Sequence, residues 1–125
     1  MNEPKFFRCN TCGNLMLAIY HSGVTPVCCG QKMEILESAS VDAAREKHVP
    51  VTVVEGNTVK VNIGSVDHPM VSEHYIEWVY LLTKQGGQLK PLSAGESPML
   101  TFALAEGDEV IRAYAYCNIH GLWND

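Results

Sequence analysis

The sequence predicts a mostly β protein, with a small metal-bound module at the N-terminus and an antiparallel β-sandwich after it. Four of the five cysteines crowd into the first 29 residues. Beyond about residue 48, short β-branched runs are separated by turn signals rich in glycine, proline and asparagine. Together these observations predict two domains, residues 1–36 and residues 37–125.

Residues 1–36 have little hydrophobic periodicity and are too few to bury much apolar surface. Modules shorter than about 40 residues usually need a metal ion, disulfides or a partner chain in order to fold. Gly13 and Gly30 each follow a cysteine, which suits tight turns that bring backbone N–H groups toward thiolate sulfurs. The sequence therefore predicts an N-terminal module organised around its cysteines.

The rest of the chain is predicted to be almost entirely β. Gly56-Asn57 and Gln85-Gly86-Gly87 mark turns between alternating segments. Five or more short strands with almost no helix predict an antiparallel sandwich. One helical turn is expected at residues 41–46, and strands are expected at residues 49–55, 59–63, 75–83, 88–92, 99–105 and 109–117.

Composition and charge exclude several classes of protein. Of the 125 residues, 46% are hydrophobic and 18% are charged, which is a globular rather than a disordered balance. No apolar stretch approaches the roughly 18 residues of a membrane span, and the first residues lack the apolar core of a signal peptide. The net charge of −5 argues against nucleic acid as the main partner. We expect a cytoplasmic protein with neither a nucleic-acid nor a membrane partner.

The four N-terminal cysteines form a metal-binding pattern, Cys9-x-x-Cys12 followed by the adjacent pair Cys28-Cys29. Clustered cysteines in a chain without a secretory signal indicate metal rather than disulfides. Four thiolates in a tetrahedral arrangement select zinc or iron, and spacing alone favours a structural zinc site. Adjacent cysteines span the ligand angle less comfortably, however, and the segment resembles desulforedoxin, a rubredoxin-like module that binds one iron through these two motifs. The resemblance implies iron.

A second group of candidate ligands consists of four histidines and the remaining cysteine. Taken singly, each histidine has an ordinary explanation as a helix end, a turn residue or a polar strand residue, and His21 is expected to be a solvated turn residue. Cys-x-x-His lets a thiolate and an imidazole reach one metal from a single turn, and these ligands suit iron, copper or zinc. Five donors are too many for a closed tetrahedral zinc site, but they fit a square pyramid that leaves one coordination position open. A thiolate ligand favours chemistry at the position opposite to itself. The residue types thus indicate a redox iron site at His48, His68, His74, Cys117 and His120.

The whole chain resembles desulfoferrodoxin, the two-iron class of superoxide reductase. This family resemblance implies a desulforedoxin-like domain followed by an immunoglobulin-like sandwich, usually in a homodimer. It implies that the four histidines named above are equatorial iron ligands and that Cys117 is the axial ligand. The one-iron class lacks some or all of the first module's cysteines, and all four are present here. Beyond these cysteines, the matching segments are Glu46-Lys47-His48-Val49-Pro50, Gly64-Ser65-Val66-Asp67-His68-Pro69-Met70, His74-Tyr75-Ile76-Glu77-Trp78 and Cys117-Asn118-Ile119-His120-Gly121.

The activity implied by the resemblance is the one-electron reduction of superoxide to hydrogen peroxide at a non-haem ferrous iron. It would detoxify superoxide in an anaerobe or microaerophile, with rubredoxin or a similar protein as electron donor. Lys47 is the expected local cation that steers the anionic substrate and orients a proton-donating water. Glu46 is expected to occupy the sixth position when the iron is ferric. As bare sequence features, both would be surface charges.

Two alternative functions remain open from the sequence. An electron-transfer iron protein without catalytic turnover explains the four-cysteine module but has no need of an open second site. A protein with zinc in both halves is the other alternative. The first iron itself has two candidate roles, as an electron relay or as a stabiliser of the dimer.

Overall fold

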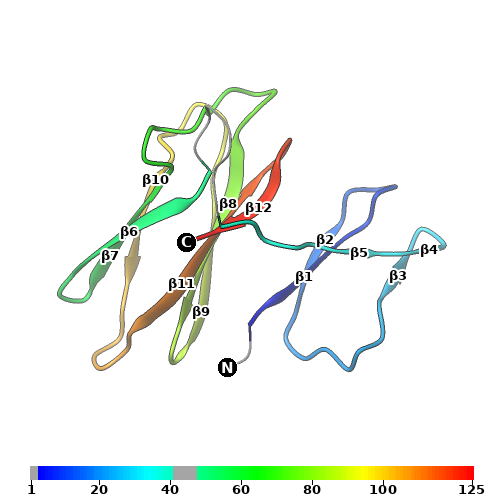
Figure 1. Ribbon diagram of the computed structural model, residues 1–125, viewed down its shortest axis with the longest axis horizontal. Helices are drawn as coiled ribbons and strands as arrows, with labels where there is room; N and C mark the ends of the chain where they lie inside the picture. The colour runs from blue at the N-terminus through cyan, green and yellow to red at the C-terminus, as the bar shows by residue number, and fades with distance from the viewer. Residues whose placement is uncertain (1–2, 41–47) are drawn as a thin grey trace. The chain divides into compact units, whose positions relative to one another are not determined.

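A computed structural model of the chain describes residues 3–40 and 48–125, and every regular element within them is a β-strand (Figure 1). The strands belong to two compact units, Met1–Glu37 and Ser38–Asp125. The helical turn predicted at residues 41–46 lies outside the described residues. In the part of the chain that the structure describes, no helix has the length and apolar character needed to cross a membrane.

The first unit is built from strands of only two to four residues. Strands this short leave no room for an alternating pattern, which explains why the sequence shows little periodicity here. A three-stranded antiparallel sheet has β1 (Lys5–Arg8) between β2 (Leu15–Ala18) and β5 (Glu34–Ile35), and a separate ribbon pairs β3 (Val27–Cys28) with β4 (Gln31–Lys32).

The apolar core of this first unit is very small. Its buried cluster consists of Phe7, Cys9 and Met33, with Ala18 and Cys28 packed against it. So few buried side chains supply little hydrophobic stabilisation. The unit is therefore of the kind that depends on a bound metal for its stability.

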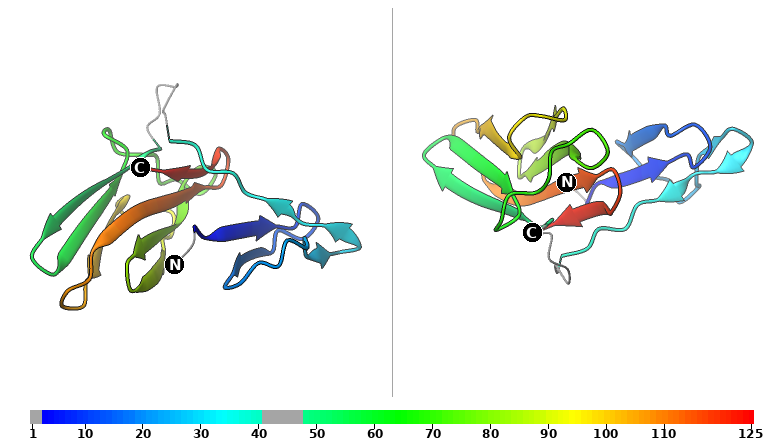
Figure 2. Two further views of the ribbon diagram at one scale, coloured as in Figure 1. Left: turned by 60° about the horizontal axis from the view of Figure 1, so that its bottom comes forward. Right: turned by 90° about the horizontal axis from the view of Figure 1, so that it is seen from above.

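The second unit is the predicted antiparallel β-sandwich. Figure 2 shows one hairpin from each of its sheets, β6–β7 in green and β11–β12 in orange and red. When its strands are lettered A, B, C, C′, E, F and G in chain order, the sheets read E-B-A and G-F-C-C′, which is an immunoglobulin-like order. The first sheet runs β10 (Met99–Ala103), β7 (Thr58–Ile63), β6 (Pro50–Glu55), and the second runs β12 (Gly121–Asn124), β11 (Val110–Cys117), β8 (Ile76–Thr83), β9 (Gly86–Pro91).

Alternation along the strands fills the space between the sheets. In β7, Val59, Val61 and Ile63 are fully buried, whereas Lys60 is exposed and Asn62 is partly exposed. The opposing sheet contributes inward residues of the same kind from β8 and β11. The rest of this core comprises Ile76, Val79, Leu81, Leu92, Phe102, Leu104, Ala113, Ala115 and Cys117.

Two strand assignments differ from the sequence-based expectation. Gly86 and Gly87 were expected to be a turn, but both belong to β9, and the turn is formed by Lys84 and Gln85. Gly87 is required there because a Cβ atom would collide with the hydroxyl of Tyr80. The strand β12 was not expected at all, since it is short and begins with a glycine.

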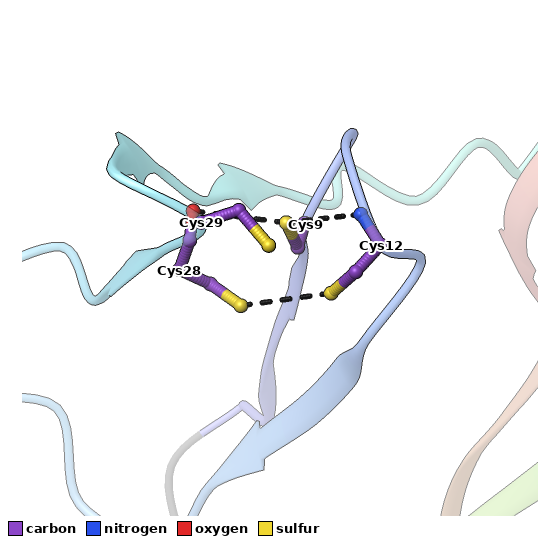
Figure 3. A group of neighbouring side chains, drawn as sticks. All are labelled: Cys9, Cys12, Cys28 and Cys29. Atoms are coloured by element: carbon purple, nitrogen blue, oxygen red, sulfur yellow. Dashed lines mark hydrogen bonds between the residues drawn. The ribbon is translucent and has the colours of Figure 1, made fainter.

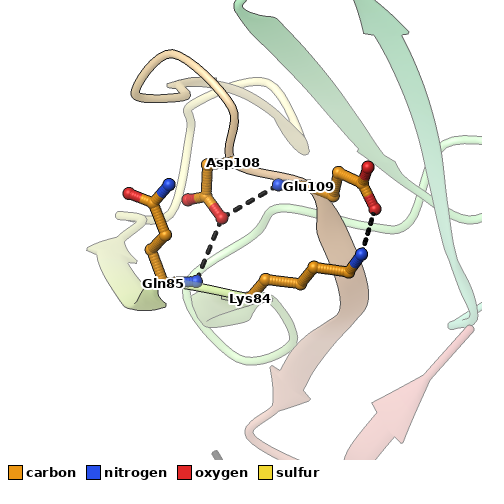
Figure 4. A network of polar contacts seen from close by, with 4 residues as sticks. All are labelled: Lys84, Gln85, Asp108 and Glu109. Atoms are coloured by element: carbon orange, nitrogen blue, oxygen red, sulfur yellow. Dashed lines mark hydrogen bonds and ion pairs between the residues drawn. The ribbon is translucent and has the colours of Figure 1, made fainter.

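A polar network closes the end of the sandwich that lies away from Cys117 (Figure 4). The Asp108 carboxylate accepts hydrogen bonds from the backbone N–H groups of Gln85 (3.0 Å) and Glu109 (2.9 Å). Lys84 and Glu109 form an ion pair at 2.6 Å, with side chains 62% and 65% exposed. Solvent screens an ion pair this exposed, and the hydrogen bonds of Asp108 also connect the β8–β9 turn to the start of β11.

Candidate metal centres

The four N-terminal cysteines come together on two turns of the first unit (Figure 3). Cys9 and Cys12 lie on the turn after β1, and Cys28 and Cys29 lie at the turn between β3 and β4. Their sulfur atoms all lie within 4.8 Å of one another, and the Sγ atoms of Cys12 and Cys28 are 3.7 Å apart. A tetrahedral ion with metal–sulfur bonds of about 2.3 Å would hold its sulfurs about 3.8 Å apart. The cluster therefore fits a single metal ion.

The local backbone bends to bring these thiols together. The N–H of Cys12 donates to Cys9 Sγ at 3.4 Å, and the N–H of Gly13 donates to the Cys9 carbonyl at 2.9 Å. Among the described residues, Cys29 is the only residue other than glycine with a positive φ, at 53°. That region is unfavourable for a side chain with a Cβ atom. The strain expected at the adjacent cysteine pair is thus present in the backbone.

The thiols of this cluster differ in acidity. Hydrogen bonds from the backbone N–H groups of Cys12 and Thr11 lower the pKa of Cys9 to about 6. Hydrogen bonding with the side chains of Cys12 and Cys9 raises the pKa of Cys29 to about 12. The metal-free cluster therefore does not ionise fully at neutral pH, and a metal that binds all four sulfurs displaces protons.

The second group of candidate ligands lies at one end of the sandwich. His48 precedes β6, His68 and His74 lie on the loop from β7 to β8, and Cys117 and His120 flank the turn from β11 to β12. Cys117 is fully buried, and His48 and His68 are each 2% exposed. His74 is partly exposed and His120 is exposed. The cluster therefore has a buried side and a side that solvent can reach.

The nitrogen and sulfur atoms of this group are close enough to share one ion. Candidate ligand atoms of His48, His74, Cys117 and His120 all lie within 4.8 Å of one another. His48 Nε2 is 3.0 Å from His120 Nδ1, and Cys117 Sγ is 3.8 Å from the same Nδ1. The backbone N–H of His120 also donates to Cys117 Sγ at 3.4 Å.

His68 lies outside this tightest group but completes a ring of imidazoles. Its ring centroid is 4.8 Å from that of His48 and 4.7 Å from that of His74. His120 closes the ring, at 5.0 Å from His74 and 4.9 Å from His48. Each imidazole thus has two neighbours at nearly equal distances, as four ligands in one plane around a metal would.

The tautomer of His68 follows from its hydrogen bond. Its Nδ1 lies 2.7 Å from the carbonyl oxygen of Pro69. A carbonyl only accepts, so Nδ1 carries the proton and the lone pair is on Nε2. A carbonyl partner of this kind is the usual way in which a metal-binding histidine is oriented.

Sequence reasoning missed Trp123, which touches two of the histidines. Its indole stacks on the ring of His48, with centroids 4.4 Å apart and planes inclined by 14°. Its Nε1–H donates to the carbonyl of His120 at 3.1 Å. The signal that could have found it is its position three residues after His120, which was overlooked because strand β12 was not expected.

The sequence-based assignment of His21 differs from the structure. His21 is not a solvated turn residue: it is partly buried, its ring edge packs against Phe7 with centroids 5.2 Å apart, and its Nε2 is shielded from solvent. The contact with Phe7 explains the difference, since an aromatic neighbour offers a packing surface for the imidazole ring. Glu46 and Lys47 lie outside the described residues.

Both halves of the chain match a known protein family. A model of the desulfoferrodoxin family matches residues 40–125, and a model of the desulfoferrodoxin N-terminal domain matches residues 1–36. The desulfoferrodoxin of Nitratidesulfovibrio vulgaris is 38% identical over 122 residues, which cover 98% of this chain and 95% of that protein.

Solved structures show the same relationship. The crystal structure of the superoxide reductase from Treponema pallidum aligns with a TM-score of 0.88 and 40% identity, covering 98% of each chain. The one-iron superoxide reductase from Giardia intestinalis aligns with a TM-score of 0.55 and 32% identity, covering 65% of this chain and 96% of its own. The second alignment is partial, as expected for a comparison with a shorter chain.

Proposed function

This chain belongs to the desulfoferrodoxin family and is a superoxide reductase, and we propose that its catalytic iron is held by His48, His68, His74, His120 and Cys117. The observation that carries this ligand set is the closed ring of four imidazoles beside a buried cysteine sulfur. Nitrogen and thiolate donors of this kind suit iron. The four-cysteine cluster and the histidine–cysteine cluster are consistent with the two iron centres of the family.

The reaction is the one-electron reduction of superoxide to hydrogen peroxide, for which bound ferrous iron supplies the electron. The protein's own contribution begins with Cys117, whose sulfur is buried and accepts a hydrogen bond from the N–H of His120. That bond stabilises the thiolate, the form of cysteine that binds a metal. The exposed side of the cluster at His120 admits a small anion from solvent.

Lys47 and Glu46 are proposed to act at this open side, because both directly precede His48 in the sequence. The ammonium group at Lys47 Nζ would attract superoxide to a protein whose net charge is −5, and would orient a water that delivers a proton. The Glu46 carboxylate would bind the ferric form and so help to displace the product.

The two halves of the chain are proposed to have separate tasks. Residues 1–36 would form the desulforedoxin-like iron-binding domain and residues 37–125 the catalytic sandwich, a division that the family matches to residues 1–36 and 40–125 support. Rubredoxin or a similar protein is the proposed electron donor, and the cytoplasm of an anaerobe or microaerophile is the proposed location. No nucleic-acid or membrane partner is proposed.

A homodimer is the proposed assembly, and the surface of the first unit supports it. Several large apolar side chains there are strongly exposed: Ile19 at 96%, Tyr20 at 85%, Val24 at 75% and Val27 at 66%. This many exposed apolar side chains on so small a unit favour contact with another chain.

An electron-transfer protein without turnover is the second candidate, and the four-cysteine cluster favours it. A carrier gives no reason for five donors at the end of the sandwich. Metal analysis with an optical spectrum tests the proposal. We expect two irons per chain and a thiolate-to-iron absorption from each site, whereas zinc in both sites would be colourless and would contradict it.

A further inference from the structure

The side chain of Asn118 connects the two loops that carry His74 and the Cys117–His120 pair. Its Oδ1 accepts a hydrogen bond from the N–H of Tyr75 at 3.0 Å, and its Nδ2 donates to the carbonyl of Glu73 at 3.1 Å. Its own N–H donates to the carbonyl of Tyr75 at 3.2 Å. One asparagine therefore binds the peptide groups on both sides of His74.

These bonds lie beside an irregularity in the strand pairing. The register of β8 and β11 becomes irregular between Tyr116 and Cys117, and Ile76 is the last residue of β8 that pairs there. His74 itself lies outside the named strands, in an isolated bridge with Val71. The hydrogen bonds of Asn118 thus continue the connection between β11 and the loop beyond the end of the sheet.

We propose that Asn118 is a positioning residue that sets His74 at the correct distance from Cys117 and His120. The inference rests on the proposed second iron site and adds to it a residue that supplies no ligand atom. A metal site requires its ligands to be held within about 0.5 Å of their working geometry. Peptide groups fixed on both sides of His74 leave its Cα little freedom relative to the turn that carries His120.

The chemistry of the side chain explains why asparagine suits this position. An amide offers one acceptor and a donor on the same short side chain, and both are used here. An ionised aspartate would keep the bond from the Tyr75 N–H but would turn a second oxygen toward the Glu73 carbonyl. Alanine would lose both bonds.

The test compares full-length wild-type protein with Asn118→Ala, Asn118→Asp and the matched control Gln88→Ala. Gln88 also donates a side-chain amide hydrogen bond to a backbone carbonyl, that of Ala103 at 2.8 Å, but it joins β9 to β10. Fe(II) is titrated anaerobically against a competing chelator. The thiolate-to-iron absorption band and the midpoint potential of the second site, together with amide hydrogen exchange at Tyr75, are then measured.

We expect Asn118→Ala to weaken Fe(II) binding at the second site about 10- to 100-fold. The band and the potential should shift, and the Tyr75 amide should exchange faster. Asn118→Asp should also weaken Fe(II) binding while the Tyr75 amide stays protected, so it carries the test if the alanine variant does not fold. The four-cysteine iron and the Gln88→Ala protein should match wild type.

Two negative results are distinguishable. If wild type binds the second iron and both Asn118 variants match Gln88→Ala in affinity, band and potential, the positioning role is wrong and the iron site stands. If wild type binds no Fe(II) beyond the four-cysteine site, the proposed function fails and the inference fails with it.

Discussion

His48 Nε2 lies 3.0 Å from His120 Nδ1, although the two residues are 72 positions apart in the sequence. Two nitrogens that bind one metal at right angles, with bonds of about 2.1 Å, would be about 3.0 Å apart. The fold therefore brings these nitrogens to the spacing of neighbouring ligands. Trp123 contacts both residues, stacking on one ring and donating to the carbonyl of the other.

Replacement of Cys117 by serine should abolish superoxide reduction and remove the thiolate-to-iron absorption of the second site. A hydroxyl is a poor substitute for the thiolate, and this sulfur is fully buried beside His120. The absorption of the four-cysteine iron should persist, because that site is built from another segment, and it serves as the control for folding. Full activity of Cys117→Ser would refute its role as a ligand.

Replacement of Cys12 by serine should disturb the first iron and leave superoxide reduction largely intact. Cys12 is exposed, and every proposed ligand of the second iron lies at or beyond residue 48. The assay uses an artificial electron donor, with iron content and oligomeric state measured in parallel. Complete loss of activity in a folded protein that retains the second iron would show that the first iron is an obligatory relay.

Replacement of Lys47 by alanine should slow the second-order reaction of the ferrous protein with superoxide. The wild-type rate should fall as salt rises, because the Debye length shrinks from about 10 Å at 0.1 M to about 3 Å at 1 M. The variant should lose most of that dependence. Stopped-flow or pulse-radiolysis traces across a salt series measure both quantities.

Lys60→Ala is the matched control for Lys47→Ala. Lys60 is exposed in the middle of β7, and its removal changes the net charge by the same amount. It should leave the rate close to that of wild type if steering is local. If wild type and Lys47→Ala have equal rates and equal salt slopes, steering by Lys47 is excluded. If the substitution instead affects only a later step, one that depends on pH and shows a solvent isotope effect, Lys47 acts in proton delivery.

Replacement of Asp108 by asparagine should make the stability of the sandwich less dependent on pH. Burial works against ionisation of Asp108, but hydrogen bonds from the Thr83 hydroxyl and from three backbone N–H groups, including that of Gln85, outweigh it and lower its pKa. A carboxylate with a lowered folded-state pKa stabilises the fold above its unfolded pKa of about 3.9, and that contribution is lost as the pH falls through the folded-state value.

The effect is measured by urea unfolding of wild type and Asp108→Asn between about pH 3 and pH 7. This range extends from about one unit below the unfolded-state pKa to about three units above it. The variant should be less stable at neutral pH, and the difference should narrow in acid. Glu106→Gln, an exposed carboxylate of the same turn, is the control. A difference that stays constant across the series would show that the charge of Asp108 does not contribute.

The two metal centres differ in how far sequence alone could predict them. Cys9-x-x-Cys12 and Cys28-Cys29 are short motifs, so their spacing indicates a metal site directly. His48, His74 and Cys117 are far apart in the sequence: their residue types indicated a redox iron site, and the resemblance to a family implied which residues are its ligands. Their meeting at one end of the sandwich is a result of strand pairing that spacing does not encode.

The supporting residues were beyond sequence reasoning for the same physical reason. The hydrogen bonds of Asn118 reach 43 and 45 positions back along the chain, and His48, the stacking partner of Trp123, is more remote still. The strands of the sandwich up to Cys117 were predicted from alternation and are present, whereas β12 was not predicted. Gly87 escaped prediction because a contact with Tyr80, rather than a turn, is what requires a glycine there.

The central claim is tested most directly by the products that the fully reduced protein forms from superoxide. Reduction predicts one hydrogen peroxide for each superoxide consumed, no release of dioxygen, and oxidation of the second iron with the appearance of its thiolate-to-iron absorption. Cys117→Ser should show none of these changes. Release of dioxygen with half the yield of peroxide would identify dismutation instead, and superoxide left unconsumed while both irons stay reduced would contradict the assignment as a superoxide reductase.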